Sequence, residues 1–298
     1  MIRRATPRVL VTGSTGFFGR HVVDALLRKG FDPIATGRAT SRSDRILDVT
    51  CGASVRGVVE KVRPDFVVNC AAYGVDYRDQ DLHEAIGVNI VGSLTLLEAA
   101  ADAGVSRFLH VGSCFEYGSC EKAVREDARL DPHGIYGITK AAASSLLIER
   151  ADDLGIPLLV ARPFGMWGPG EGAHRLVPQI IRACRREEPL DLTPCDVIRD
   201  YSYVEDLARD LVELVAIDDW GSNPIINLAS GRAVLLRDFV LRIANALDGA
   251  SLMRFGRRPH RRDELVSLHA DIGLFKRMVG ETSTTTIGMA LSRMDVGR

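Results

Sequence analysis

The stretch that decides the fold is RVLVTGSTGFFGR, residues Arg8 to Arg20. An apolar run typical of a buried strand leads into three glycines, Gly13, Gly16 and Gly19, and then into a helical pattern. In this setting the first glycine permits a tight turn, the second lets the backbone approach a pyrophosphate, and the third lets the helix pack closely on the sheet. The helix N-terminus adds unpaired N–H groups and partial positive charge. The stretch therefore predicts a dinucleotide site.

The rest of the first half repeats this alternation of strand and helix patterns. Strands are expected at 8–13, 32–37, 65–72, 107–113 and 157–163, and helices at 18–30, 89–104 and 136–155. Such alternation predicts an α/β fold with a Rossmann-type doubly wound parallel sheet.

The pattern is less regular beyond about residue 163. Helices are expected at 204–217 and 235–249, and a strand at 226–230. We predict an NAD(P)-binding domain over 1–163 and a smaller, irregular α/β substrate-binding domain over 164–298, with part of 196–230 returning to the first. The smaller domain is expected at the carboxyl edge of the sheet, where open α/β sheets bind ligands.

Composition narrows the class of protein. The chain has 298 residues, a formal net charge of −1 and 6% aromatic residues, which offers little to nucleic acid. Six cysteines without a CxxC pair suit reduced thiols, and seven histidines without close ligand spacing argue against a metal site. No stretch reads as long and apolar enough to span a bilayer, and no signal peptide precedes the first strand. We expect a cytoplasmic protein without nucleic-acid or membrane partners.

The end of the second strand bears on which dinucleotide binds. An NAD site places an acidic residue there for the ribose 2′-hydroxyl, whereas an NADP site has a small residue and an arginine. Here Gly37 is followed by Arg38, with Arg42 nearby, which favours NADP(H) and leaves NAD(H) possible. Asp48, after the next strand, is either an acceptor for the adenine amino group or an ordinary strand-end aspartate.

A tyrosine and a lysine stand on one face of the helix at 136–155. Tyr136 and Lys140 are four residues apart, so they share a face. A lysine ammonium beside a phenol favours the phenolate and would lower the pKa of Tyr136 toward working pH. We expect Ser113, at the end of the preceding strand, to face the same crevice, which makes Tyr136 a candidate general acid and base.

Five motifs in order, TGSTGFFG, NIVGSLTLLEAA, VGSCFEYG, YGITK and IRDYSYVEDLA, resemble the extended short-chain dehydrogenase/reductases, in particular the branch of nucleotide-sugar epimerases, dehydratases and reductases. The resemblance implies that Tyr136 exchanges a proton with the sugar. It implies that Lys140 holds the nicotinamide ribose and that Ser113 hydrogen-bonds the reacting oxygen. It also implies a homodimer, paired through the helices that begin near Asn89 and Tyr136.

The resemblance further implies two sets of binding residues. The cofactor set is Gly13, Thr15, Gly16, Phe17, Phe18, Gly19, Arg38, Asp48, Val49, Ala71, Ala72, Asn89, Tyr136, Lys140 and Pro163. The substrate set is Tyr73, Cys114, Arg175, Arg199 and Arg261. Arg199 and Arg261 match family arginines that bind the substrate diphosphate. One departure is Gly165, where many relatives have an asparagine; Trp167 nearby is expected to pack between domains rather than stack on a ligand.

The residues after Ser113 restrict the reaction. Sugar-nucleotide 4,6-dehydratases have Asp-Glu where this chain has Cys114 and Phe115, which disfavours dehydration. The cysteine is one place away from the one used for epimerisation at C3 and C5, and Glu116 is a possible extra acid. The leading hypothesis is NADP(H)-dependent reduction of a nucleotide-linked 4-keto-6-deoxyhexose, and the alternative is an NAD-dependent nucleotide-sugar 4-epimerase. A non-catalytic NADP-sensing regulator on the same fold is a third reading, which would expect Tyr136 and Lys140 to be lost.

Overall fold

The structure is a computed structural model that describes residues 6–38, 45–76, 78–221, 224–260 and 264–294. Its centre is a seven-stranded parallel sheet with the order β11-β6-β5-β4-β1-β2-β3. The strands of this sheet are β1 (Arg8–Thr12), β2 (Asp32–Gly37), β3 (Arg45–Ile46), β4 (Phe66–Asn69), β5 (Arg107–Val111), β6 (Leu158–Pro163) and β11 (Ile225–Leu228). The architecture is Rossmann-type and confirms the predicted fold class.

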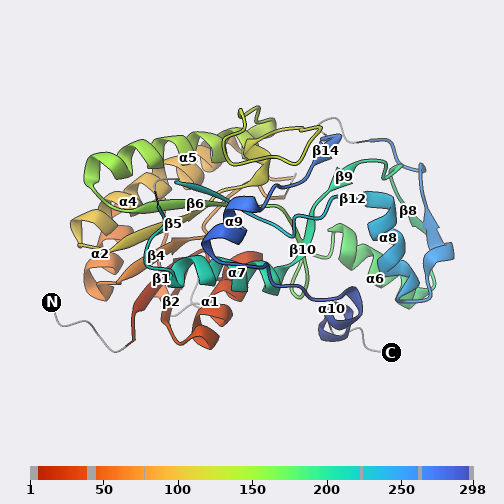
Figure 1. The fold of residues 1–298 in the computed structure, drawn as a ribbon, viewed down its shortest axis with the longest axis horizontal. Helices are drawn as coiled ribbons and strands as arrows, with labels where there is room; N and C mark the ends of the chain where they lie inside the picture. The colour runs from red at the N-terminus through yellow and green to blue at the C-terminus, as the bar shows by residue number, and fades with distance from the viewer. Residues whose placement is uncertain (1–5, 39–44, 77, 222–223, 261–263, 295–298) are drawn as a thin grey trace.

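Helices cover both faces of this sheet (Figure 1). One face carries α1 (Phe17–Lys29) and α7 (Val204–Ala216), which pack on each other. The other carries α2 (Gly52–Val62), α4 (Ser93–Asp102) and α5 (Gly134–Leu154). The strands read as continuous apolar runs because both of their faces are buried. The sequence interpretation assigned no helix to the α2 segment.

The helix expected from Asn89 begins earlier than predicted. It starts with α3 (Leu82–Ala85), where the Asp81 side chain accepts from the Glu84 N–H at 3.0 Å, and continues through a π-helical segment, Ile86–Gly92, into α4. The joined run, Leu82–Asp102, is 21 residues long, and an 18-residue window within it has a mean hydropathy of 1.3. By length and composition it could cross a membrane, so the expectation that no stretch would qualify was wrong. Half of its apolar window is buried inside the protein.

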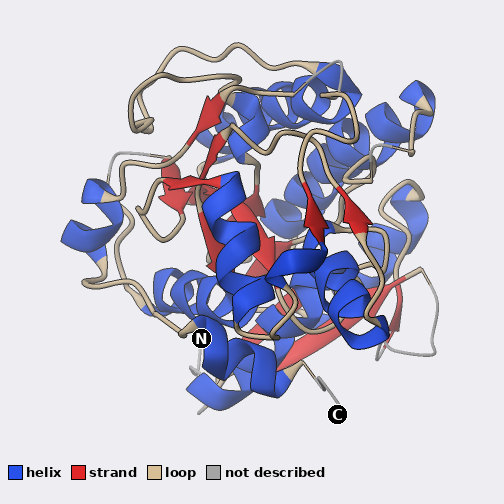
Figure 2. Ribbon diagram, turned by 90° about the vertical axis from the view of Figure 1, so that its right-hand side faces the viewer, coloured by secondary structure: helices blue, strands red, loops and turns tan. Residues whose placement is uncertain are grey.

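Chain segments from beyond Pro163 build part of the large sheet and all of a smaller domain. β11 pairs in parallel with β6, and α9 (Gly273–Met278) packs against β11. The smaller domain contains α6 (Leu176–Arg186), α8 (Leu236–Asn245) and α10 (Ile287–Arg293), with the short strands β7 (Gly165–Trp167), β8 (Leu190–Asp191), β9 (Ile198–Arg199), β10 (Tyr201–Tyr203), β12 (Val234–Leu235), β13 (Met253–Arg254) and β14 (Ser267–Leu268). The helix expected to reach 249 ends at Asn245, and a turn follows it. Figure 2 views the molecule from the side of this smaller domain.

The smaller domain has its own hydrophobic core. Trp167 is buried there against Tyr203 and Phe239, with ring centroids 5.5 and 5.9 Å away. Trp167 is therefore a packing residue, but it lies in the core of the smaller domain and not, as the sequence had led us to expect, between the two domains. β7 and β10 form a two-stranded parallel sheet that continues the chain from the carboxyl end of β6 into this domain.

Candidate active site

The glycine loop between β1 and α1 is shaped by close backbone approach. Gly13 has φ +62°, and a Cβ on it would lie 2.7 Å from the Ala71 nitrogen. A Cβ on Gly19 would overlap the Gly13 carbonyl oxygen, and the Gly16 N–H donates to that same oxygen at 3.0 Å. Only glycine fits at these places, and the loop leaves backbone surface where a side chain would otherwise stand.

The loop ends at the N-terminus of α1, beside Thr15, Phe17 and the buried Phe18. Gly16 is the N-cap and supplies no side-chain acceptor to the first N–H groups of the helix. Unpaired N–H groups and the positive end of the helix dipole suit a phosphate. The loop and the helix N-terminus therefore fit the pyrophosphate of a dinucleotide.

The end of β2 has no carboxylate. A Cβ on Gly37 would meet the Thr15 methyl group at 3.0 Å, so the position is closely packed. The exposed Arg38 lies 3.2 Å from Glu84. Asp48 accepts hydrogen bonds from the Thr50 hydroxyl and N–H, which lower its pKa. Val49, beside it, is buried. Arg42 lies outside the described residues.

The loop after β4 is fixed by two asparagines. The Ala71 N–H donates to Asn69 Oδ1 at 3.2 Å, and the Tyr73 N–H donates to Asn89 Oδ1 at 2.8 Å. The Asn89 amide donates back to the Tyr73 carbonyl at 3.0 Å and to the Thr139 hydroxyl of α5 at 2.9 Å. Asn89 thus ties this loop, with Ala71, Ala72 and Tyr73, to the helix that carries the tyrosine and the lysine.

Ser113 and Tyr136 come together at the carboxyl ends of β5 and β6, where Pro163 also lies. Ser113 caps a short 3-10 helix, Cys114–Glu116, where its side chain accepts from the Phe115 N–H at 3.2 Å, and it acts on Tyr136 so as to lower the pKa of the phenol. The ring of the half-exposed Phe115 stands edge-on to the Tyr136 ring, with centroids 6.1 Å apart. Phe115 and Ser113 therefore border the tyrosine, as the sequence suggested.

The expected pKa of Tyr136 was wrong for this structure. Burial raises the pKa of the phenol above its ordinary value, and the hydrogen bond with Ser113 opposes this only in part. The Lys140 amine instead lies 3.1 Å from His110 Nε2 and donates to the Val111 carbonyl at 2.6 Å. Burial lowers the pKa of Lys140 to about 8. In this structure the Lys140 amine is thus bonded to the β5 segment, and burial governs the pKa of the phenol.

Glu116 is part of the framework and not an extra acid. Its carboxylate is fully buried and pairs with Arg162 at 2.8 Å, while its other oxygen accepts from the Ser113 N–H at 2.8 Å and the Ser144 hydroxyl at 3.0 Å. A Cβ on Gly112 would lie 2.5 Å from this carboxylate, so the preceding glycine makes room for it. Every Glu116 contact supports the turn that carries Ser113.

Two of the predicted substrate residues, Arg175 and Arg199, act electrostatically on groups of the candidate site. Arg175, the N-cap residue of α6, lies 3.7 Å from Glu171 and acts electrostatically on Tyr136. Arg199 on β9 acts in the same way on Cys114, whose pKa burial raises to about 12. That thiol is an unreactive neighbour at neutral pH. Arg261 lies outside the described residues.

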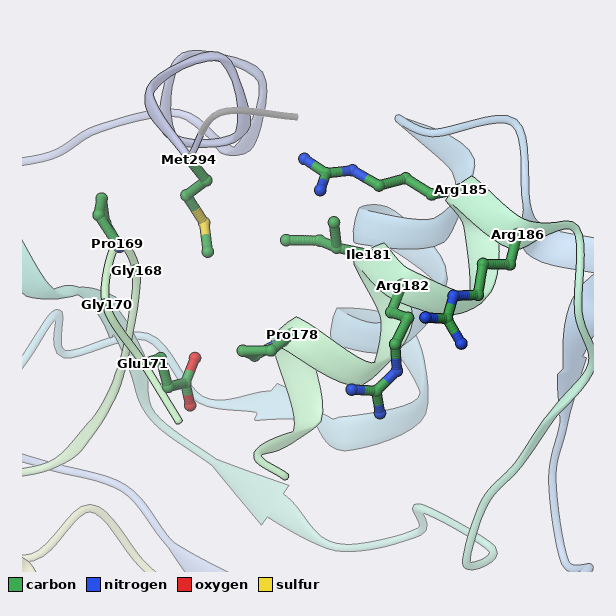
Figure 3. Close-up of a pocket in the computed structure, with 10 residues that line it drawn as sticks. All are labelled: Gly168, Pro169, Gly170, Glu171, Pro178, Ile181, Arg182, Arg185, Arg186 and Met294. Atoms are coloured by element: carbon green, nitrogen blue, oxygen red, sulfur yellow. The ribbon is translucent and has the colours of Figure 1, made fainter. Parts of the chain in front are cut away.

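A separate cavity of about 430 Å³ opens between the loop at Gly168–Glu171, helix α6 and Met294 (Figure 3). Arg182, Arg185 and Arg186 line one side of it. The Glu171 carboxylate projects toward α6, and its buried Oε2 has no hydrogen-bond partner. Burial raises the pKa of Glu171 to about 7. None of the predicted site residues lines this cavity.

Two residues that support the site, His110 and Arg162, were not predicted from the sequence. His110 is a lone polar residue inside the apolar run RFLHV, which is a usable signal for a buried polar partner. The partner of Arg162 is distant in sequence. Within the described residues, no group of three or more His, Cys, Asp or Glu side chains could hold a metal ion.

The chain matches a known protein family and several of its members. Residues 9–229 match the model of the NAD dependent epimerase/dehydratase family. The dTDP-4-dehydrorhamnose reductase of Streptomyces griseus is 33% identical over 220 residues, covering 73% of this chain and 68% of that protein. The GDP-6-deoxy-D-mannose reductase of Pseudomonas aeruginosa is 28% identical over 251 residues, 80% of each chain.

Solved structures of similar fold include epimerases. The UDP-glucose 4-epimerase of Thermus thermophilus, in complex with NAD, superposes with a TM-score of 0.84 at 22% identity, covering 96% of this chain and 98% of that one. MoeE5 in complex with UDP-glucose and NAD gives a TM-score of 0.84 at 27% identity, covering 96% and 97%. Because these superpositions cover 96% of this chain, the fold similarity includes the smaller domain.

Proposed function

This chain belongs to the NAD dependent epimerase/dehydratase family, and from that premise we propose that it reduces a nucleotide-linked 4-keto-6-deoxyhexose with NADPH. The family and the catalytic pair make it an NAD(P)-dependent enzyme of the short-chain oxidoreductase type. The proposal concerns the reaction, the substrate and the choice of cofactor.

One observation carries the choice of reaction: the site has a single acid and base. The Ser113 side chain acts on the Tyr136 phenol and lowers its pKa, while the two positions after Ser113 are a buried thiol, Cys114, and a phenyl ring, Phe115. The Glu116 carboxylate forms a buried ion pair with Arg162. Elimination of water needs a second acid and base near the sugar, and this turn supplies none. Redox chemistry at one carbon needs only the pair that is present.

Each residue then has a role in reduction. When bound, NADPH supplies the hydride. The Tyr136 hydroxyl gives its proton to the sugar carbonyl oxygen, and Ser113 donates a hydrogen bond to that oxygen. A phenol whose pKa is raised by burial remains protonated at neutral pH, which is the form that a reductase needs at the start of its cycle. Lys140 would hold the nicotinamide ribose.

The end of β2 supports NADP(H). Gly37 leaves no carboxylate to repel a 2′-phosphate, and Arg38 is the adjacent cation, with 71% of its side chain exposed. The Glu84 carboxylate now paired with Arg38 is itself exposed, so exchange for a phosphate would cost little.

The substrate end of the proposal depends on arginines at the domain border. Arg175 and Arg199 act electrostatically on the reacting tyrosine and its neighbour Cys114, which places positive charge beside the crevice. Guanidinium groups suit a diphosphate. Similar proteins are named for dTDP- and GDP-linked sugars, so both nucleotides belong in the test.

The experiment begins with denaturing freshly purified protein and identifying the nucleotide that is released. NADPH oxidation is then followed with dTDP- and GDP-linked 4-keto-6-deoxyhexoses, and Tyr136→Phe is the matched control. Turnover that needs NADPH and is lost in the control supports the proposal. Near-stoichiometric NAD⁺ with no net NADPH oxidation rejects it in favour of a 4-epimerase, the alternative favoured by similarity to UDP-glucose 4-epimerases.

Further parts of the proposal concern assembly and location. Val91, Ile138 and Leu146 are exposed apolar side chains on the helices proposed to pair in a homodimer, and light scattering that shows a monomer at micromolar concentration would reject this. The six cysteines are free, which suits a cytoplasmic enzyme, and a net charge of −1 suits one without nucleic-acid or membrane partners. The presence of Tyr136 and Lys140 favours an enzyme over an NADP-sensing regulator.

A further inference from the structure

We propose that His110 is a positioning residue that favours the neutral amine of Lys140 over the ammonium in the cofactor-free enzyme, because Asn69 fixes the histidine in the tautomer whose N–H faces the lysine. The catalytic meaning of this device rests on the proposed function, whereas the hydrogen-bond geometry does not.

The orientation of the Asn69 amide is the first step. The Ala71 backbone N–H, which can only donate, points at one side-chain atom of Asn69 at 3.2 Å. That atom must therefore be the oxygen, and it also accepts from the Thr12 hydroxyl at 2.6 Å. The other atom is the amide nitrogen, which lies 3.0 Å from the Ser93 hydroxyl and 3.2 Å from His110 Nδ1. One amide hydrogen goes to each.

The tautomer of His110 follows. Because the Asn69 amide donates to Nδ1, that nitrogen offers its lone pair and carries no hydrogen. A neutral imidazole then has its hydrogen on Nε2. His110 is fully buried, and its pKa is held well below the ordinary value by burial and by Lys140. The doubly protonated ring is thereby disfavoured.

The charge of Lys140 is the next consequence. Its Nζ lies 3.1 Å from His110 Nε2 and donates to the Val111 carbonyl at 2.6 Å. An ammonium has three N–H groups and no lone pair, so it would meet the Nε2 hydrogen donor against donor. A neutral amine accepts from Nε2 and still donates to the carbonyl. His110 Nε2–H and the Val111 carbonyl therefore match the hydrogen bonds of a neutral Lys140 amine better than those of an ammonium.

Other groups around Lys140 act in both directions. Lys140 is completely buried, which favours the neutral form, while Glu116 and Cys70 favour the charged form. The Glu116 carboxylate is paired with Arg162, and burial raises the pKa of the Cys70 thiol to about 12, so that thiol is uncharged at neutral pH. The net charge near Lys140 is thus small, so the hydrogen bond from His110 contributes to the choice between the amine and the ammonium of Lys140.

For the reaction, this means that the positive charge on Lys140 appears only when the Tyr136 phenolate forms. In reduction Tyr136 loses its proton to the substrate, and a lysine ammonium stabilises the phenolate that remains. A Lys140 in the neutral form can take up from solvent, as the phenolate forms, the one proton that the reduction consumes overall. His110 thereby sets the pH at which the site can support that phenolate.

The first test is nitrogen NMR of the full-length, ¹⁵N-labelled protein without cofactor, from about pH 6 to about pH 9. His110→Phe identifies which of the seven histidine signals belongs to this ring. The expected result is an Nε2–H tautomer that does not titrate. An Nδ1–H tautomer, or an imidazolium in this range, would overturn the proposal. This readout needs no substrate, so it stands or falls separately from the reductase activity.

The second test reverses the tautomer with Asn69→Asp. An aspartate keeps the acceptor for Ala71 and Thr12, but its other oxygen accepts from Nδ1–H, which leaves the Nε2 lone pair facing Lys140. We expect the His110 signal to switch tautomer and the pH limb of kcat/KM set by Lys140 to move up by about one unit or more. Asn245→Asp, an exposed site on α8, is the control of equal charge. A variant at residue 69 that keeps the original tautomer, or a limb that stays in place after the switch, contradicts the inference.

Discussion

Substitution of Glu116 by glutamine gives the most direct test of how the catalytic turn is built. Glu116 and Arg162 form a buried pair whose side chains are 0% and 2% exposed. The carboxylate accepts from the guanidinium through Nε and Nη2, both at 2.8 Å. Glutamine preserves the oxygen that accepts from the Ser113 N–H, but it turns an NH₂ group toward the arginine. The guanidinium charge then stays buried without a counter-ion, which costs about 3–5 kcal/mol.

The assay is urea unfolding followed by circular dichroism, with the free energy of unfolding compared among three proteins. Glu84→Gln is the matched control, because Glu84 pairs with Arg38 at the surface at 3.2 Å, with side chains 39% and 71% exposed. An exposed pair contributes less than about 1 kcal/mol. If Glu116→Gln loses no more stability than Glu84→Gln, the buried pair does not support the turn and the reasoning fails.

Three further outcomes are expected. Tyr136→Phe should reduce kcat by about 10²–10⁴-fold while NADPH affinity measured by fluorescence changes less than about twofold, because only the proton donor is removed; retained turnover would place the acid elsewhere. Gly19→Ala should weaken NADPH binding at least about tenfold, since its Cβ would strike the Gly13 carbonyl, whereas Gly57→Ala, with nothing within 4 Å, should bind normally and be slightly more stable. Burial raises the pKa of Glu171 to about 7 from 4.5, so the folded state holds an extra proton between those values and stability falls as the pH rises through them. Glu171→Gln should therefore be more stable than the parent by up to about 3 kcal/mol near pH 8 and nearly equal to it near pH 4, as thermal melts at the two pH values would show.

Much of the larger domain was predictable because its signals are local. The run from Arg8 to Arg20 contains the strand, the three glycines and the helix start within one short segment, and Gly30 with φ +90° ends the helix as expected. Apolar runs identified β4, β5 and β6 for the same reason. The helix α2 was missed, although its buried Val55, Val59 and Val62 stand at helical spacing.

The candidate catalytic residues Ser113, Tyr136 and Lys140 were identified from motifs, but the groups that surround them in the structure were not predicted. The prediction of a lowered tyrosine pKa took Lys140, four residues away, as its partner. In the structure the lysine turns to His110 on the neighbouring strand, 30 residues earlier in the chain, and burial decides the pKa of the phenol. Helical spacing predicts which side chains share a face of the helix. It does not predict which residue of another strand or helix a long side chain contacts.

The sequence by itself determined the strand, glycine loop and helix that open the fold, most strands and helices of the larger domain and the candidate reacting groups, because periodicity, glycine spacing and short motifs are properties of neighbouring residues. Only the tertiary structure decided what those groups experience: the Glu116–Arg162 pair, the Asn69–His110–Lys140 chain and the joining of β11 to β6 each unite segments dozens of residues apart. Desolvation and hydrogen bonding depend on everything within a few ångströms, and these neighbours are assembled only when the sheet forms.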